Sequence, residues 1–258
     1  MRLVAFFSFF LISWGCMAID LVAHRGNAGG ALENSVAAVL ASAAAGANVI
    51  ELDVQISKDN VVYLFHDKSI NGKNVVDLTY DQIVKITTSE RVPRLENVLS
   101  LNSFNGIYLL DLKFSSVKSL DVLAQTIRST VVPMEQIIIQ SSDVAMLAHG
   151  NQILPKCQYF YLERLSRTFP FFAIPVPEKI LEKVNDLDIQ GISVKGRRFL
   201  NSEYISLLKS TGLRIYVWTI NDIERAKYYT GIGVDGVITD SLEEMRKMLS
   251  EMIERGDV

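Results

Sequence analysis

Cysteine is scarce in this chain of 258 residues, which contains only Cys16 and Cys157. Because Cys16 lies in a segment that we expect to be cleaved, one thiol would remain, which excludes an internal disulfide. We expect Cys157 to be a buried apolar residue in a strand. The chain also lacks a run of basic residues, and its formal net charge is −3. Nucleic acid is therefore not an expected partner, since binding it requires clustered lysine and arginine.

The apolar run at the N-terminus is short. It follows one basic side chain, Arg2, and ends in the small-residue sequence Cys16-Met17-Ala18. A helix needs roughly 20 apolar residues to span a bilayer, so this pattern is more typical of a secretory signal peptide. We expect residues 1–18 to be a signal peptide and the protein to be secreted or periplasmic. The alternatives are an uncleaved anchor and, as a minor possibility, lipoprotein anchoring.

The remaining residues, 19–258, number about 240 and suffice for one large domain, as in a single βα barrel. The residues with plausible chemistry gather near its start. Short apolar runs at 21–23 and 49–54 are strand-like, and an alanine-rich run at 36–45 between them is helix-like. Asn34 or Ser35 can cap this helix. The unit is therefore strand, helix, strand, which is a parallel crossover.

Polar residues occupy the ends of this unit. His24 and Arg25 follow the first strand, and Glu33 and Asn34 lie in the next loop, where a βα barrel carries its active site. Glu51 and Asp53 are two apart on a strand, so their side chains share one face. Two carboxylates on one face of a buried strand are costly unless a cation binds between them.

The segment 60–67 begins too soon after the second strand for a parallel crossover, so it must fold back as a hairpin. Folding back carries His66 toward Glu51 and Asp53. Two histidines and two carboxylates then share one small region.

These motifs, in this order and spacing, resemble the glycerophosphodiester phosphodiesterase family. The resemblance runs from about residue 21 to 240, nearly the whole expected mature chain. Its motifs are His24-Arg25-Gly26, Glu33-Asn34-Ser35, Glu51-Leu52-Asp53-Val54, Lys58-Asp59, His66-Asp67, Val92-Pro93-Arg94-Leu95-Glu96, Asp111-Leu112-Lys113, Val217-Trp218-Thr219-Ile220-Asn221-Asp222 and Gly233-Val234-Asp235-Gly236-Val237-Ile238-Thr239-Asp240.

The rest of the chain alternates strands and helices. Eight strands are expected, at 21–23, 49–54, 107–113, 137–140, 158–162, 192–194, 214–219 and 236–239. Helices are expected at 116–129, 202–209, 222–229 and 241–254. This order predicts a parallel (β/α)8 TIM barrel with a short β-hairpin extension after the second strand, which is also the fold that the resemblance implies.

On this fold, Asp111 and Lys113 share one face of the third strand. Asp111 would complete a set of three carboxylates with Glu51 and Asp53, and Lys113 would meet an anion. Carboxylates without thiols specify one hard divalent cation, Ca²⁺ or Mg²⁺. The family commonly has glutamate at the position of Asp111, which is one methylene shorter. A metal-free barrel in which the carboxylates pair with Arg25 and Lys113 is the alternative.

The resemblance implies metal-dependent hydrolysis of a glycerophosphodiester. His24 and His66 would be the acid and the base, and Arg25 and Lys113 would assist the metal at the phosphate. Glu33 and Asn34 would hold these residues in place without contacting the substrate themselves. Trp218 would form a wall for the glycerol, unless it simply packs in the barrel. The third histidine, His149, is expected in a surface loop.

Two other functions remain open: a phospholipase-like barrel acting on lysolipids or sphingolipids, and a non-catalytic binding module. The oligomeric state is not specified by the sequence.

Among the segments that depart from the family, two bear on the pocket. Residues 68–72 form a shortened loop after His66-Asp67, which could reshape the alcohol side of the pocket. The apolar segment 168–177 has three prolines, which prevent regular structure. It would emerge at the active-site rim, where Phe169 to Pro177 could contact lipid or pack on the barrel helices.

Overall fold

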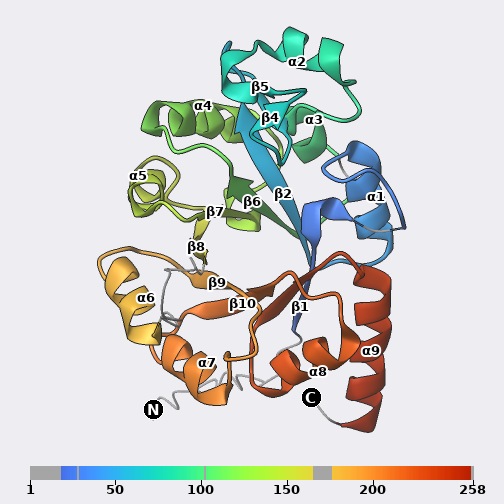
Figure 1. Ribbon diagram of the computed structural model, residues 1–258, viewed down its shortest axis with the longest axis vertical. Helices are drawn as coiled ribbons and strands as arrows, with labels where there is room; N and C mark the ends of the chain where they lie inside the picture. The colour runs from blue at the N-terminus through green and yellow to red at the C-terminus, as the bar shows by residue number, and fades with distance from the viewer. Residues whose placement is uncertain (1–18, 28, 102, 165–175, 257–258) are drawn as a thin grey trace, which may run out of the picture.

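Among the residues that the structure describes, which are 19–27, 29–101, 103–164 and 176–256, eight parallel strands close into a ring. In this computed structural model the sheet order is β1, β11, β10, β9, β8, β7, β6, β2, and β1 also pairs with β2. Figure 1 shows helices around this ring. The strands are β1 Asp20–Ala23, β2 Val49–Ile56, β6 Ile107–Leu112, β7 Ile137–Ser141, β8 Gln158–Glu163, β9 Gly191–Lys195, β10 Arg214–Trp218 and β11 Gly236–Thr239.

The helices follow the strands in alternation. Several begin at a side chain that accepts a hydrogen bond from the first turn, such as Ser35 from the Ala38 N–H at 3.1 Å, which satisfies an otherwise free backbone donor. The helices are α1 Val36–Ala44, α2 Tyr80–Ile86, α3 Leu95–Leu99, α4 Val117–Arg128, α5 Val144–Ile153, α6 Pro177–Val184, α7 Ser202–Lys209, α8 Ile223–Gly231 and α9 Leu242–Arg255; the 3-10 turns are η1 His24–Gly26, η2 Val75–Asp77 and η3 Met134–Gln136.

A hairpin extends the second barrel strand. β3, Val62–Leu64, runs antiparallel to β2 with Leu64 beside Val54. A second, smaller hairpin follows from β4, Ser69–Ile70, and β5, Lys73–Asn74. Its turn is Asn71-Gly72, with φ of 49° and 76°, a combination that suits a tight turn between two strands.

The barrel interior is apolar in its middle layer. One inward-facing residue from each of seven strands packs there: Val22, Val49, Leu109, Ile138, Phe160, Tyr216 and Ile238. The larger core lies outside the ring, between the strands and the helices. Because the middle is filled, the inward-facing residues one layer further along each strand form the floor of any site at the carboxyl end.

The predicted TIM barrel and its hairpin are confirmed. Two local predictions were wrong. His149 lies on α5 and pairs with Asp121 at 2.8 Å, because the helix continues through Gly150. Cys157 is buried as expected, with its pKa raised to about 12 by burial, but it precedes β8.

Two other predictions fall outside the described residues. These are the signal peptide at 1–18 and most of the lipid-contact segment 168–177, of which the structure describes only Val176 and Pro177 at the start of α6. Among the described helices, none is long and apolar enough to cross a membrane.

Candidate active site

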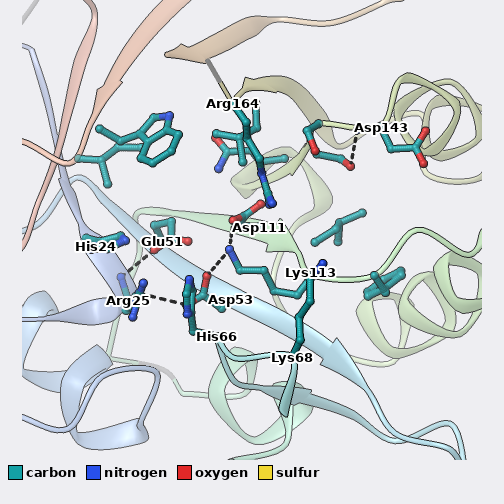
Figure 2. A pocket seen from close by; sticks show the side chains of 18 of the residues that line it. His24, Arg25, Glu51, Asp53, His66, Lys68, Asp111, Lys113, Asp143 and Arg164 are labelled. Carbon is teal, nitrogen blue, oxygen red and sulfur yellow. Dashed lines mark hydrogen bonds and ion pairs between the residues drawn. The ribbon is translucent and has the colours of Figure 1, made fainter. Parts of the chain in front are cut away.

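A cavity of about 560 Å³ opens at the carboxyl end of the barrel strands. Figure 2 shows polar side chains from several strands converging on it. Eight of the ten predicted site residues line it: His24, Arg25, Glu51, Asp53, His66, Asp111, Lys113 and Trp218. The other two, Glu33 and Asn34, contact these residues from the loop before α1.

Three carboxylates form the floor of the cavity. Glu51 and Asp53 lie on β2, and Asp111 lies beside Asp53 in the parallel pairing of β2 with β6. Each offers an oxygen within 4.8 Å of the others, and all three residues are buried. The alternation of side chains along β2 thus places both of its carboxylates inside the ring, as predicted from their spacing.

Two cations contact this cluster. Lys113 Nζ lies 2.8 Å from Asp53 Oδ1 and also pairs with Asp111 Oδ2. Arg25 Nε lies 3.3 Å from Asp53 Oδ2, and its Nη1 donates to Glu33 Oε2 at 2.8 Å. The three carboxylates therefore face two permanent cations, so this group of five side chains carries one excess negative charge when all are ionised.

The loops that hold these groups adopt left-handed backbone conformations. Arg25 has φ of 55°, and its N–H donates to Glu51 Oε2 at 2.7 Å. Asn34 has φ of 57°. Its side chain donates to Asp53 Oδ2 at 2.8 Å and accepts from the Asp53 N–H at 2.9 Å. Such conformations cost energy in residues other than glycine and persist where surrounding contacts fix them. Here the contacts are with the carboxylates.

The charges in the cluster shift each other's titration. Burial, together with the charge of Asp53, raises the pKa of Glu51 to about 8. Burial alone would raise the pKa of Asp53, but Lys113, Asn34 and Arg25 together lower it. Burial raises the pKa of Asp111, opposed by Lys113. Neighbouring carboxylates overcome burial and raise the pKa of Lys113.

The cluster fits a divalent cation. Its ligand atoms are hard carboxylate oxygens, which Ca²⁺ and Mg²⁺ prefer. Asp111 Oδ1 is buried and has no hydrogen-bond partner among the described residues. A buried charged oxygen without a partner is costly, and a cation would satisfy it. The pairs with Arg25 and Lys113 therefore leave room for a metal.

His24 has a partner that sequence reasoning did not assign. Its Nδ1 lies 2.6 Å from Asp240 Oδ1, and Asn221 Nδ2 donates to Asp240 Oδ2 at 2.7 Å. Burial alone would lower the pKa of His24, but Asp240 and Glu51 raise it. The hydrogen bond from His24 is the main cause that lowers the pKa of Asp240. Both partners lie in motifs quoted above, and the pairing of Ala23 with Thr239 places Asp240 beside His24.

His66 and Trp218 lie on different sides of the cavity. His66 Nδ1 lies 2.8 Å from Asp67 Oδ1, with 39% of its side chain exposed. Trp218 ends β10, which is opposite β6 in the ring. Its Nε1 is buried without a partner among the described residues, and Lys195 Nζ lies 5.4 Å from its ring centroid. An unpartnered donor that lines a cavity is available to a ligand.

Comparisons with known proteins agree with this geometry. The sequence profile of the Glycerophosphoryl diester phosphodiesterase family matches residues 24–244. The chain belongs to this family. The match spans His24, His66, all three carboxylates and Asp240. As a member of the glycerophosphodiester phosphodiesterase family the protein is a phosphoric diester hydrolase, so the predicted family and enzyme class are confirmed.

Individual relatives cover most of the chain. A Bacillus subtilis protein provisionally named glycerophosphodiester phosphodiesterase YhdW is 28% identical, covering 85% of this chain and 93% of its own. A Rattus norvegicus protein named lysophospholipase D is 25% identical, covering 90% and 86%. The structure of an Oleispira antarctica phosphodiesterase in complex with sn-glycerol-3-phosphate is similar with a TM-score of 0.74 at 19% identity, covering 90% and 96%.

Proposed function

We propose that this glycerophosphodiester hydrolase releases glycerol 3-phosphate and an alcohol by acid–base catalysis with His24 and His66. The observation that carries the proposal is the convergence of both histidines on one cavity with Glu51, Asp53 and Asp111. A phosphodiester needs charge neutralisation, a proton acceptor and a proton donor, and this cavity offers all three. The Oleispira antarctica phosphodiesterase, whose structure contains its product sn-glycerol-3-phosphate, supports the same product here.

The two histidines present the same ring nitrogen to the substrate. Because Nδ1 of His24 is bonded to Asp240 and Nδ1 of His66 to Asp67, Nε2 of each ring remains for the reaction. One Nε2 takes a proton from the nucleophile, which is water or the neighbouring hydroxyl of the glycerol; in the second case water then opens the cyclic glycerophosphate to glycerol 3-phosphate. The other Nε2 gives a proton to the departing alcohol oxygen.

Arg25 and Lys113 bind the phosphate oxygens, since both extend from the carboxylate cluster into the cavity. One Ca²⁺ or Mg²⁺ held by Glu51, Asp53 and Asp111 would neutralise charge on the phosphate as a Lewis acid. Trp218 forms the wall against which the glycerol packs. Glu33 and Asn34 keep Arg25 and Asp53 in place through the hydrogen bonds described above.

Lysolipids are a second candidate substrate class. The observation that favours them is the rat relative named lysophospholipase D, which aligns with 90% of this chain. The segment 168–177 supports the same idea from the sequence, since an apolar segment at the rim would contact a lipid. Replacing Phe169, Phe171 and Phe172 with serine should lower activity on lysolipids selectively. Equal loss on soluble diesters would count against this role.

We also propose that residues 1–18 are a signal peptide and that the protein acts outside the cytoplasm. Their single basic residue and short apolar run support this. The N-terminal sequence of the protein recovered from the periplasm or medium tests it, because processing after Ala18 leaves Ile19 first. An intact N-terminus on cell-associated protein would contradict it.

The decisive experiment uses residues 19–258 with glycerophosphocholine as substrate, in Ca²⁺, in Mg²⁺ and in chelator. Release of glycerol 3-phosphate should require a cation and fall roughly 10²–10⁴-fold in His24→Ala and in His66→Ala. His149→Ala is the matched control, because His149 lies outside the cavity on α5. It should retain full activity.

The same experiment separates catalysis from binding alone. If folded protein turns over none of glycerophosphocholine, lysophosphatidylcholine and an anionic diester such as glycerophosphoinositol 4-phosphate under any of these conditions, the non-catalytic binding module becomes the better description. Cation-independent turnover would instead remove the metal from the proposal and leave the histidines in place.

A further inference from the structure

Two cations in the cavity have no part in the reaction as proposed. Lys68 follows His66-Asp67, and Arg164 follows the last residue of β8; both line the cavity. Figure 2 shows their side chains entering from opposite edges and pointing toward Lys113 and Asp111. Neither has an ion pair or side-chain hydrogen bond with any other described residue. Because no carboxylate in the described part of the chain forms a hydrogen bond or ion pair with either cation, an anion that lies between them is favoured.

The chain around Lys68 is built to hold it there. The β4–β5 hairpin turns tightly at Asn71-Gly72. Val75 directly follows β5, and its N–H donates to the Lys68 carbonyl at 3.0 Å. Gln55 Nε2 on β2 donates to the Asp67 carbonyl at 3.2 Å. Both hydrogen bonds fix the backbone next to Lys68, so its side chain starts from a defined point at the cavity edge.

Arg164 is also directed inward. It lines the cavity, and Figure 2 shows its side chain pointing toward Asp111 on the cavity floor. Apart from Asp111 of the carboxylate cluster, the acidic residues of this edge are engaged elsewhere. Asp67 accepts from His66, and Asp143 caps α5 by accepting from the Ala145 N–H at 3.0 Å. The remaining polar residues of this edge are Gln140 and the serines at 115, 141 and 142, whose amide and hydroxyl groups can donate to an anion.

The position of these cations relative to Trp218 assigns them to one end of the substrate. Trp218 ends β10, and the carboxylates lie across the ring from it on β2 and β6. If glycerol packs on Trp218, the scissile phosphate lies over the carboxylates and the alcohol extends toward β6. Lys68 and Arg164 point to that part of the cavity, and Lys113 is also on the β6 side.

We propose that the alcohol released by this enzyme carries an anionic group, such as a second phosphate, which Lys68 and Arg164 bind. This inference rests on the proposed phosphodiesterase activity and specifies its substrate class. A cationic alcohol such as choline would place its charge beside two cations and is disfavoured. An alcohol phosphate would accept hydrogen bonds from both.

The test compares two diesters with the same glycerophosphate half. Glycerophosphoinositol 4-phosphate has an anionic alcohol, and glycerophosphocholine has a cationic one. The readout is the ratio of their kcat/KM values, measured as glycerol 3-phosphate release. The wild-type ratio should favour the anionic diester. Lys68→Met and Arg164→Gln should each lower the ratio about tenfold, mainly through KM for the anionic diester, and Lys68→Glu should lower it further.

Matched controls are Lys73→Met, on the same small hairpin, and Arg198→Gln; neither residue lines the cavity. Both should leave the ratio unchanged. Raising the salt concentration should lower the wild-type ratio more than that of Lys68→Met, since partly exposed charges are screened. Melting temperatures confirm that each variant is folded.

The outcomes separate the two proposals. Turnover of both diesters with a ratio that does not respond to Lys68 or Arg164 would refute the anionic-alcohol site and leave the phosphodiesterase intact. Equal losses on both diesters would assign these cations to the scissile phosphate and also refute it. Turnover of neither diester would overturn the proposed function, and this inference with it.

Discussion

Asp240→Asn should disable His24 although the change is nearly isosteric. Asp240 accepts from His24 Nδ1 at 2.6 Å and from Asn221 Nδ2 at 2.7 Å. The Asn221 amide cannot turn over, because its Oδ1 accepts from the Asp240 N–H at 2.8 Å and from Thr239 Oγ1 at 3.2 Å. An amide at position 240 must therefore present its oxygen to Asn221 and its NH₂ group to His24.

An NH₂ group facing His24 forces Nδ1 to accept, so the ring proton moves to Nε2. A neutral ring with its proton on Nε2 can neither take a proton there nor act as a strong acid. We therefore expect kcat to fall about 10²–10⁴-fold, or about 2.7–5.4 kcal/mol in the barrier. The pKa of His24, which Asp240 raises against burial, should fall in the variant. Steady-state kinetics and an NMR titration of the imidazole measure the two effects.

A second change provides the control. In the double variant Asp240→Asn with Asn221→Asp, a carboxylate at position 221 accepts from the new NH₂ group, as well as from Thr239 and the backbone N–H. The amide oxygen at 240 then faces His24 and restores the original tautomer. Activity should recover to within about tenfold of wild type, since a neutral acceptor forms a weaker hydrogen bond than a carboxylate. A single variant close to wild type, or a double variant no better than the single one, would refute this reasoning.

Three further predictions follow from the site. Ca²⁺ or Mg²⁺ at about 100 times its dissociation constant should stabilise the protein by about 2.7 kcal/mol, which raises Tm by roughly 5–10 °C. Thermal melts with and without chelator measure this rise, and Asp111→Asn should abolish it. An undiminished rise in the variant would contradict the metal site. Asn34→Ala should cost about 2–4 kcal/mol in urea unfolding, because it leaves buried Asp53 without two hydrogen bonds; a loss below about 0.5 kcal/mol would argue against that role. In the folded protein the pKa of His24 is raised above its ordinary 6.5, and the pKa of Asp240 is lowered below 3.8. The pair therefore stabilises the fold most at pH values between 3.8 and 6.5. This stabilisation is lost as pH rises through the folded pKa of His24 and as pH falls through the folded pKa of Asp240. His24→Ala should therefore cost more stability at pH 5.5 than at pH 9, and equal costs at both would show that the pair does not shift these pKa values.

The barrel could be predicted because its signals are local. Each strand is a short apolar run, and several helices begin at a capping side chain, such as Ser35 or Asn201. Alternation along β2 was enough to place Glu51 and Asp53 on the inner face. These features depend on neighbours in sequence, so no tertiary information was needed to find them.

α5 shows where local signals mislead. Gly150-Asn151 has the composition of a loop, which is why His149 was expected in one. In the structure the helix continues, because Gly150 packs against the ring of Tyr159. A Cβ at position 150 would lie 2.5 Å from Tyr159 Cε1. This glycine serves close packing between helix and strand, a tertiary reason that composition does not reveal.

The partner of His24 required the closure of the barrel. Asp240 is 216 residues away in sequence, and no spacing rule connects the two. Closure pairs β1 with β11 so that Ala23 lies beside Thr239, and the next residue on each strand is His24 and Asp240. Once a closed ring is accepted, this pairing follows from counting residues beyond the last strand. The information was therefore present in the sequence, but only after the fold had been inferred.

The shortened loop after His66-Asp67 needed the structure for a different reason. The sequence shows that residues are missing there, which suggested a wider alcohol side of the pocket. In the structure this short loop folds into the tight β4–β5 hairpin. The hydrogen bond from the Val75 N–H to the Lys68 carbonyl closes the hairpin. Lys68 is then directed to the cavity. A loop length gives the space that is available, whereas the direction of a side chain depends on the hydrogen bonds that close the loop. The alcohol side of this pocket is therefore better described by its charge than by its width.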